Sequence, residues 1–142
     1  HLQTAPGVFE ESGLELGFPQ GANTRGLVAR DVNGDGVLDV LIADYRRSPW
    51  LMLSTGCTAE NWLVVEAPLG TVIRVDVGGE QRTGLVTHHQ GYSGFGPVEH
   101  HMGLGAFTEV QRVVATVPGV GEVSLNETLT LPRRIRWSAS VD

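Results

Sequence analysis

Apolar and polar residues alternate along this chain in short runs, and no long run repeats with the period of a helix. The clearest run is GTVIRVDV at 70–77, in which residues 71, 73, 75 and 77 share one face. Thr, Ile, Val and Val occupy those positions, so this face is expected to be buried. Gly78 and Gly79 follow, and both accept the positive φ of a hairpin turn. Further strands are predicted at 26–30, 37–44, 61–67, 81–89, 98–104, 109–117, 121–125, 128–131 and 133–137.

Short strands punctuated by glycine and proline predict an all-β sandwich or barrel. The 19 glycines and 7 prolines among 142 residues supply the turns that such a fold needs. The small, polar stretch Ser54–Glu60 marks the expected boundary between residues 1–57, an N-terminal arm with a metal-loop unit, and residues 58–142, a larger β domain. The arm, residues 1–18, has apolar side chains but no evident partner strand. We expect it to pack on its own domain or to add a strand to a neighbouring subunit.

The stretch DVNGDGVLD at 31–39 places oxygen-bearing side chains at odd positions around two glycines. Such a loop suits calcium, which accepts about six to eight oxygen ligands in a flexible geometry, better than magnesium, which demands a strict octahedron. It is not an EF-hand, because Ile42 stands where that motif has a bidentate glutamate. A solvated acidic turn is the alternative. The predicted calcium ligands are Asp31, Asn33, Asp35, the Val37 carbonyl and Asp39.

Two segments resemble known families. DVNGDGVLDVLIAD, preceded by GLVAR, resembles an FG-GAP (VCBS-type) repeat, the calcium-bearing unit of integrin α-chain propellers. From about Asn61 onward the chain resembles the ASPIC/UnbV domain of cartilage acidic protein-like secreted proteins, through NWLVVE (61–66), GYSGFG (91–96), HMGLG (101–105) and VQRVVATVPG (110–119). The resemblance implies a secreted, calcium-associated β module without an established catalytic set.

Only one such metal loop occurs in the sequence, whereas a propeller needs about four to eight blades. The expected fold is therefore a single propeller-blade-like calcium-loop unit packed with a β-sandwich or barrel-like domain. One blade cannot bury both of its faces or close its edges. It should lean on the second domain, on another copy of the chain, or on both.

Charge and composition narrow the partners and the location. A net charge of -6 disfavours nucleic acid. No apolar run approaches the roughly 18 residues that a membrane span requires. The chain starts at His1, and we interpret this start as the product of leader removal in a secreted, extracellular protein. The single Cys57 is expected to be a buried thiol.

Other polar groups carry weaker hypotheses. His88–His89 and His100–His101 flank a predicted hairpin and could bind zinc or copper, although packing roles are favoured. His1 could chelate copper in an oxygenase-like enzyme, a remote alternative. Arg133, Arg134 and Arg136 either protect an edge strand or dock on an acidic surface. Asn126 begins a glycosylation sequon.

No nucleophile elbow, HExxH helix, P-loop or dinucleotide fingerprint occurs, so the chain is not expected to be an enzyme. The sequence predicts an extracellular calcium-binding structural or adhesive module. It is expected to self-assemble into a homo-oligomer or filament through strand or edge contacts. The alternative is a monomeric module that binds a glycan or an extracellular protein.

Overall fold

The computed structural model of the chain describes residues 2–18, 21, 23–55, 60–89 and 91–137. These residues form strands and no helix, which confirms the all-β prediction, and none of their sheets closes into a barrel. Accordingly, no described segment is a helix that could cross a bilayer. The strands are β1 (Leu2–Ala5), β2 (Val8–Glu10), β3 (Thr24–Arg30), β4 (Asp39–Asp44), β5 (Trp50–Met52), β6 (Asn61–Glu66), β7 (Val72–Val77), β8 (Glu80–Leu85), β9 (Thr87–His89), β10 (Phe95–Gly105), β11 (Glu109–Val110), β12 (Arg112–Val117), β13 (Gly121–Leu125), β14 (Leu129–Thr130) and β15 (Arg133–Arg136).

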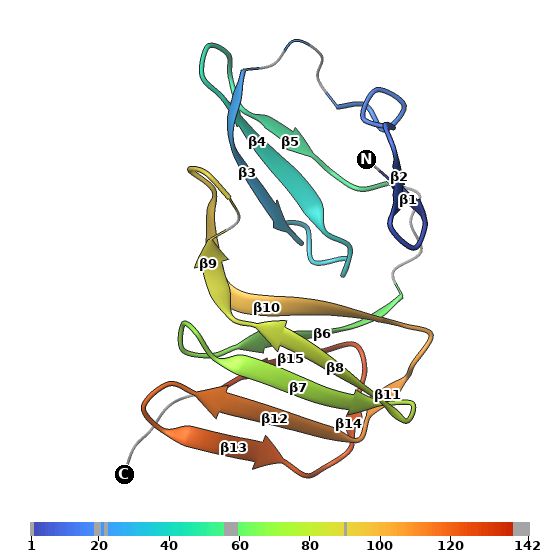
Figure 1. Cartoon of the computed structure of the whole chain (residues 1–142), viewed down its shortest axis with the longest axis vertical. Coiled ribbons are helices and arrows are strands. Elements are labelled where there is room, and N and C mark those ends of the chain that lie inside the picture. The colour runs from blue at the N-terminus through green and yellow to red at the C-terminus, as the bar shows by residue number, and fades with distance from the viewer. Residues whose placement is uncertain (1, 19–20, 22, 56–59, 90, 138–142) are drawn as a thin grey trace.

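The C-terminal part of the chain is a sandwich of two four-stranded sheets (Figure 1). One sheet has the order β15-β6-β10-β9 and the other has the order β13-β12-β7-β8. Neighbouring strands are antiparallel except β15 and β6, which run parallel. A small β11–β14 ladder joins the sandwich at its side.

Both sheets of the sandwich contribute to one apolar core. Residues 71, 73, 75 and 77 are fully buried, which confirms the face predicted from alternation in β7. Gly78 and Gly79 both adopt positive φ in the β7–β8 turn, as predicted. The core consists of Leu63, Val65, Ala67, Ile73, Val75, Val77, Val86, Met102, Leu104, Val110, Val113, Ala115, Val117, Leu129 and Leu131.

Two predicted strands are each divided in the structure. The run predicted at 81–89 breaks at Val86, whose amide donates to the Thr71 carbonyl, so β8 and β9 belong to different sheets. The run predicted at 109–117 breaks at Gln111, whose amide donates to the Asp76 carbonyl. In both places the apolar pattern continues while the backbone changes its hydrogen-bonding partner.

The N-terminal part contains a separate three-stranded sheet, β3-β4-β5, with only antiparallel pairs. Ile42 is its buried hydrophobic side chain, whereas Leu41 and Leu51 are 44% and 51% exposed. Those two leucines are cross-strand neighbours, so they lie on the same face of the sheet. This small sheet has much less buried apolar surface than the sandwich.

The arm before β3 contains a short hairpin rather than a single strand. β1 and β2 pair with each other around a turn in which Gly7 has positive φ. Further along, Leu16 and Phe18 line a small pocket with Val40 and Met52, so this part of the arm lies against the three-stranded sheet. This part of the arm therefore lies on its own unit, whereas Val8, Phe9 and Leu14 are 50%, 59% and 66% exposed. Addition of a strand to a neighbouring subunit stays a prediction.

The β9–β10 hairpin connects the sandwich to the small sheet. Figure 1 shows β9 extending from the sandwich toward β3. The carbonyl of Ser93, near the hairpin tip, lies so close to Gly26 of β3 that an added Cβ would be 2.7 Å from it. Gly26 is buried there, so the two units are in direct contact.

Candidate metal centre

The predicted calcium loop connects β3 to β4, at the end of the small sheet that faces the sandwich (Figure 1). Asp31 directly follows β3, and Asp39 is the first residue of β4. The hairpin therefore holds the first and last predicted ligands at neighbouring ends of two paired strands. Arg30 and Asp39 are register partners at its base.

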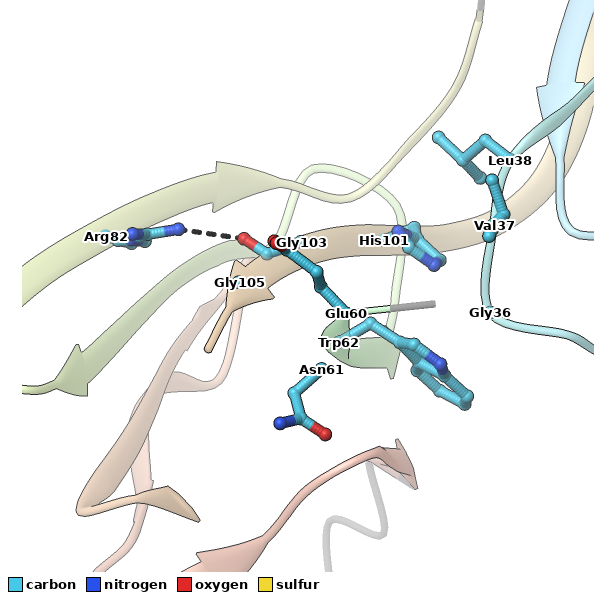
Figure 2. Close-up of a pocket in the computed structure, with 10 residues that line it drawn as sticks. All are labelled: Gly36, Val37, Leu38, Glu60, Asn61, Trp62, Arg82, His101, Gly103 and Gly105. Atoms are coloured by element: carbon cyan, nitrogen blue, oxygen red, sulfur yellow. Dashed lines mark hydrogen bonds between the residues drawn. The ribbon is translucent and has the colours of Figure 1, made fainter. Parts of the chain in front are cut away.

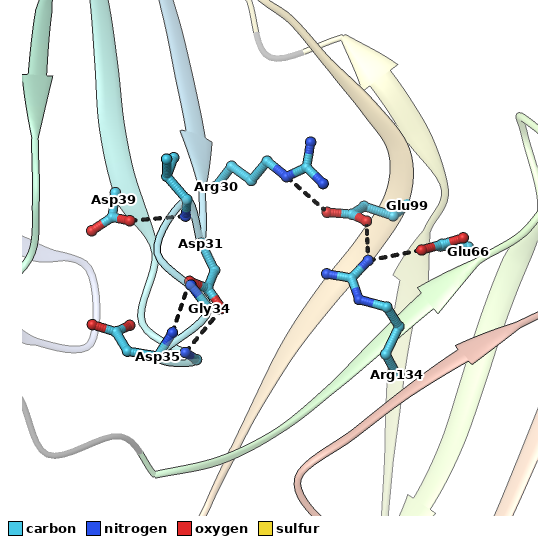
Figure 3. Close-up of polar contacts among 10 residues, drawn as sticks. Arg30, Asp31, Gly34, Asp35, Asp39, Glu66, Glu99 and Arg134 are labelled. Atoms are coloured by element: carbon cyan, nitrogen blue, oxygen red, sulfur yellow. Dashed lines mark hydrogen bonds and ion pairs between the residues drawn. The ribbon is translucent and has the colours of Figure 1, made fainter.

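Asp31 organises the loop through backbone amides. One carboxylate oxygen accepts from the amides of Gly34 at 2.6 Å and Asp35 at 3.1 Å, and the other accepts from Gly36 at 2.9 Å (Figure 3). Gly34 and Gly36 have φ of 81° and 87°, a conformation that glycine adopts without strain. The chain thus wraps around the Asp31 carboxylate.

Asn33 and Asp35 add short local bonds. The side-chain oxygen Oδ1 of Asn33 accepts from the Asp35 amide at 3.1 Å, and the side-chain NH2 of Asn33 donates to Asp35 Oδ2 at 2.8 Å. Asp35 Oδ1 accepts from the Val37 amide at 2.8 Å. The side chains of Asp31, Asn33 and Asp35 therefore all accept hydrogen bonds from backbone amides of the loop.

Asp39 closes the loop from the inside. It is fully buried, and its two oxygens accept from the amides of Val32 and Ser54, each at 2.9 Å. These amide bonds, the Val32 bond foremost, hold the pKa of Asp39 below its ordinary value despite the opposing effect of burial. Asp39 is therefore a carboxylate at neutral pH, and it ties the loop to Ser54, two residues after β5.

The loop has the donor chemistry that calcium requires. A carboxylate offers about four acceptor positions, so Asp31 and Asp35 retain capacity beyond their amide bonds. The Val37 carbonyl accepts no hydrogen bond from the described residues. In the described part of the chain, however, no three His, Cys, Asp or Glu side chains converge closely enough to hold a metal. Asp39 points to backbone amides, so a cation would rely on the amide and carbonyl oxygens as well.

The sandwich packs directly on this loop. The indole of Trp62 lies so near Gly36 that an added Cβ would be 2.0 Å from Nε1. Trp62 also stacks on His101, with ring centroids 5.8 Å apart and planes inclined by 26°. Burial lowers the pKa of His101, while the charge of Asp31 and the backbone of Gly36 oppose that shift. The imidazole and indole together form the surface on which the loop rests.

A chain of ion pairs runs beside this contact (Figure 3). Arg30 Nε of β3 lies 3.8 Å from Glu99 of β10. Arg134 of β15 bonds both Glu99 and Glu66, and Arg136 bonds Glu66 at 2.6 Å. The arginines lower the pKa of Glu66, Arg136 having the largest effect. Arg134 and Arg136 are thus engaged within their own chain on an edge strand, which favours the structural role of this basic group.

The other predicted groups are dispersed. His88 and His89 both contact Phe95, with centroids 5.5 and 4.6 Å away, whereas His100 packs over Gly84 of β8. The four histidines do not converge on one point. Asn126 is exposed and accepts from Arg112 Nε at 3.1 Å. His1 and Cys57 lie outside the described residues.

Comparison of the chain with models of protein families and with curated proteins finds no match. The FG-GAP and ASPIC/UnbV resemblances therefore stay predictions from short motifs.

Sequence reasoning missed the parts of the site that come from the sandwich. Trp62, Glu99 and His101 lie on the outer face of the β6–β10 ladder, opposite the core. Val64 is an apolar residue on the same face as Trp62 and is 1% exposed, so NWLVVE has buried apolar residues on both faces. That pattern indicates a covered strand, but it does not identify the loop as the covering element.

Proposed function

We propose that this chain is an extracellular calcium-binding module in which a loaded loop stabilises a small β unit against a sandwich. The supporting observation is the arrangement of Asp31, whose carboxylate gathers three loop amides while the buried Asp39 carboxylate fixes the base. Such a loop concentrates negative charge that a divalent cation would neutralise. The FG-GAP and ASPIC/UnbV resemblance supports the same proposal.

Asp31, Asn33, Asp35, the Val37 carbonyl and Asp39 are the proposed ligands. A bound calcium would supply a positive charge that links these oxygens. The chain's own contribution is to hold them in place: Gly34 and Gly36 permit the tight wrap, and Trp62 covers the loop at Gly36. An extracellular module of this kind binds calcium with a dissociation constant of about 10⁻⁴ to 10⁻³ M.

Isothermal titration calorimetry of chelator-stripped protein tests the metal site. We expect one calcium per chain and a rise in melting temperature. At about ten times the dissociation constant the gain is about 1.4 kcal/mol. Asp35→Asn should remove most of this binding, because it deletes one charge from an exposed loop side chain. Glu109→Gln, an exposed acid in β11, is the matched control. Absence of both heat and stabilisation in the unmodified chain contradicts the proposal.

We further propose that the module self-associates through the three-stranded sheet. Two observations support this step: the sheet leaves Leu41 and Leu51 exposed as neighbours, and β3 and β5 are its two edges within the described residues. Exposed edges and apolar faces of sheets are the surfaces through which such units assemble. A contact repeated head to tail would build a filament.

Sedimentation velocity at increasing protein and calcium concentrations tests the assembly. We expect larger species in the unmodified chain and their loss in Leu41→Ser/Leu51→Ser. The control is Leu85→Ser, which removes a leucine of equal exposure, 50%, from β8 of the sandwich. A single monomeric boundary under every condition overturns self-association and leaves the calcium proposal intact.

A further inference from the structure

A second candidate site lies beside the loop, in an open pocket of about 720 Å³. One wall is loop segment 36–38, and the other is built from the ends of β6 and β10 (Figure 2). Pockets between two units of a fold are common places for small-ligand binding. Neither the proposed calcium ligands nor the ion pairs fill this space.

Glycine creates the floor of the pocket. Trp62 of β6 is the register partner of Gly103 of β10, so the two residues share the outer face of the ladder. Nothing lies within 4 Å of the place where a Cβ of Gly103 would stand. The missing side chain leaves a hollow beside the indole ring. Trp62 is part-exposed, so this aromatic surface is accessible from the hollow.

Polar side chains lie at the edge of the floor. The carboxylate of Glu60 makes no hydrogen bond to any described residue, whereas the indole Nε1 of Trp62 lies against Gly36 of the loop. Figure 2 shows Glu60 extending toward Gly103 and Gly105, while the Asn61 side chain points away from them. Arg82 is already engaged, since its Nη1 donates to the Gly103 carbonyl at 2.8 Å. Within the described part of the chain, the lining thus offers acceptor oxygens at Glu60 and guanidinium donors at Arg82.

We propose that this pocket binds a neutral saccharide. A sugar ring has an apolar face that stacks on an aromatic side chain, and its hydroxyl groups both donate and accept hydrogen bonds. Trp62 supplies the aromatic surface, Glu60 supplies an acceptor, and the guanidinium of Arg82 supplies donors. The Glu60 carboxylate, which has no partner among the described residues, and the net charge of -6 disfavour an anionic sugar. The site does not require a cation in the loop.

A printed array of neutral, N-acetylated and sialylated oligosaccharides tests the site, followed by calorimetric titration with the neutral glycan bound best. We expect Gly103→Val to weaken binding at least about tenfold, because its side chain fills the hollow. Gly103 has ordinary strand φ and open space around it, so Gly103→Val should fold normally. Glu60→Ala should also weaken binding, since it removes an acceptor that has no partner among the described residues. Thr83→Val, on an exposed position of β8, is the matched control.

Several results would overturn the saccharide site. One is an array with no bound neutral glycan, and another is preferential binding of sialylated glycans. A third is glycan binding that survives in Gly103→Val, and a fourth is a pocket that selects members of a random peptide library instead. The calcium titration of the same protein is a separate readout, so failure of the saccharide site is distinguishable from failure of the metal loop.

Discussion

The sandwich and the three-stranded sheet are stabilised in different ways. The sandwich buries fifteen apolar residues in one cluster shared by its two main sheets and the small ladder at its side. The small sheet buries Ile42 and depends on polar contacts instead. Its buried Asp39 carboxylate accepts hydrogen bonds from the amides of Val32 in the loop and Ser54 after β5. Burial of apolar surface stabilises a fold without directional bonds, whereas a buried carboxylate stabilises it only while its hydrogen-bond donors stay in place. The comparison indicates that the small unit needs its loop and its neighbour, and that the sandwich does not.

Removing apolar volume from the sandwich should have the largest effect. Ile73→Ala, at a position with no exposed surface, should cost about 2–5 kcal/mol of unfolding free energy. Leu41→Ala, on the exposed face of the small sheet, should cost less than about 1 kcal/mol. Urea denaturation followed by circular dichroism measures both. Equal losses in the two variants would contradict the comparison.

Asp39→Asn should loosen the small sheet selectively. The substitution places an NH2 group against a backbone N–H. It also removes the negative charge to which the amides of Val32 and Ser54 donate. Amide hydrogen exchange in β3, β4 and β5 should accelerate roughly tenfold or more, while β7 and β12 keep their protection. Asp76→Asn, a carboxyl in β7 that bonds the Gln81 side chain, is the control. Uniform acceleration in both units would show that they unfold together.

The two ion pairs of Glu99, one within the sandwich and one to the small sheet, should differ in strength. Glu99 has a 10% exposed side chain and bonds Arg134 within the sandwich, whereas it meets the half-exposed Arg30 of the small sheet at 3.8 Å. Double-mutant cycles should give about 1–2 kcal/mol for Arg134–Glu99 and less than about 0.5 kcal/mol for Arg30–Glu99. The variants are Glu99→Gln, Arg134→Gln and Arg30→Gln. A larger coupling for Arg30 would make this ion pair the main link between the units.

Acidification should produce the smallest effect, and it should act on the sandwich. Burial lowers the pKa of His100 against Gly84, so the folded chain binds its proton less readily than the unfolded chain. Stability therefore falls as pH drops below about 6.5, the ordinary histidine value, toward the folded pKa. His100→Gln should flatten the decline in melting temperature between about pH 7 and pH 5. An unchanged decline in His100→Gln would contradict this assignment.

Local alternation made most of the strands predictable, because it depends only on neighbouring residues. The N-terminal hairpin and β5 were the exceptions. Pro6–Gly7 is a turn signal between β1 and β2, yet the stretch looked unpartnered, and the three residues of β5 are too few to show alternation. The loop residues could likewise be proposed from their spacing. The contact of Trp62 with Gly36 could not, because these residues are far apart in sequence and meet only through tertiary packing. The glycine floor of the pocket was hidden for the same reason.

Gly26 allows the β9–β10 hairpin to approach β3 closely. Its backbone has no positive φ, so conformation does not demand glycine there; the nearby Ser93 carbonyl does. The separation between the hairpin tip and the small sheet is therefore set by the thickness of a bare α-carbon. A side chain at this position would push the hairpin tip away from β3, and a larger side chain would push it further. The angle between the two units could therefore be changed by substitution at this single residue.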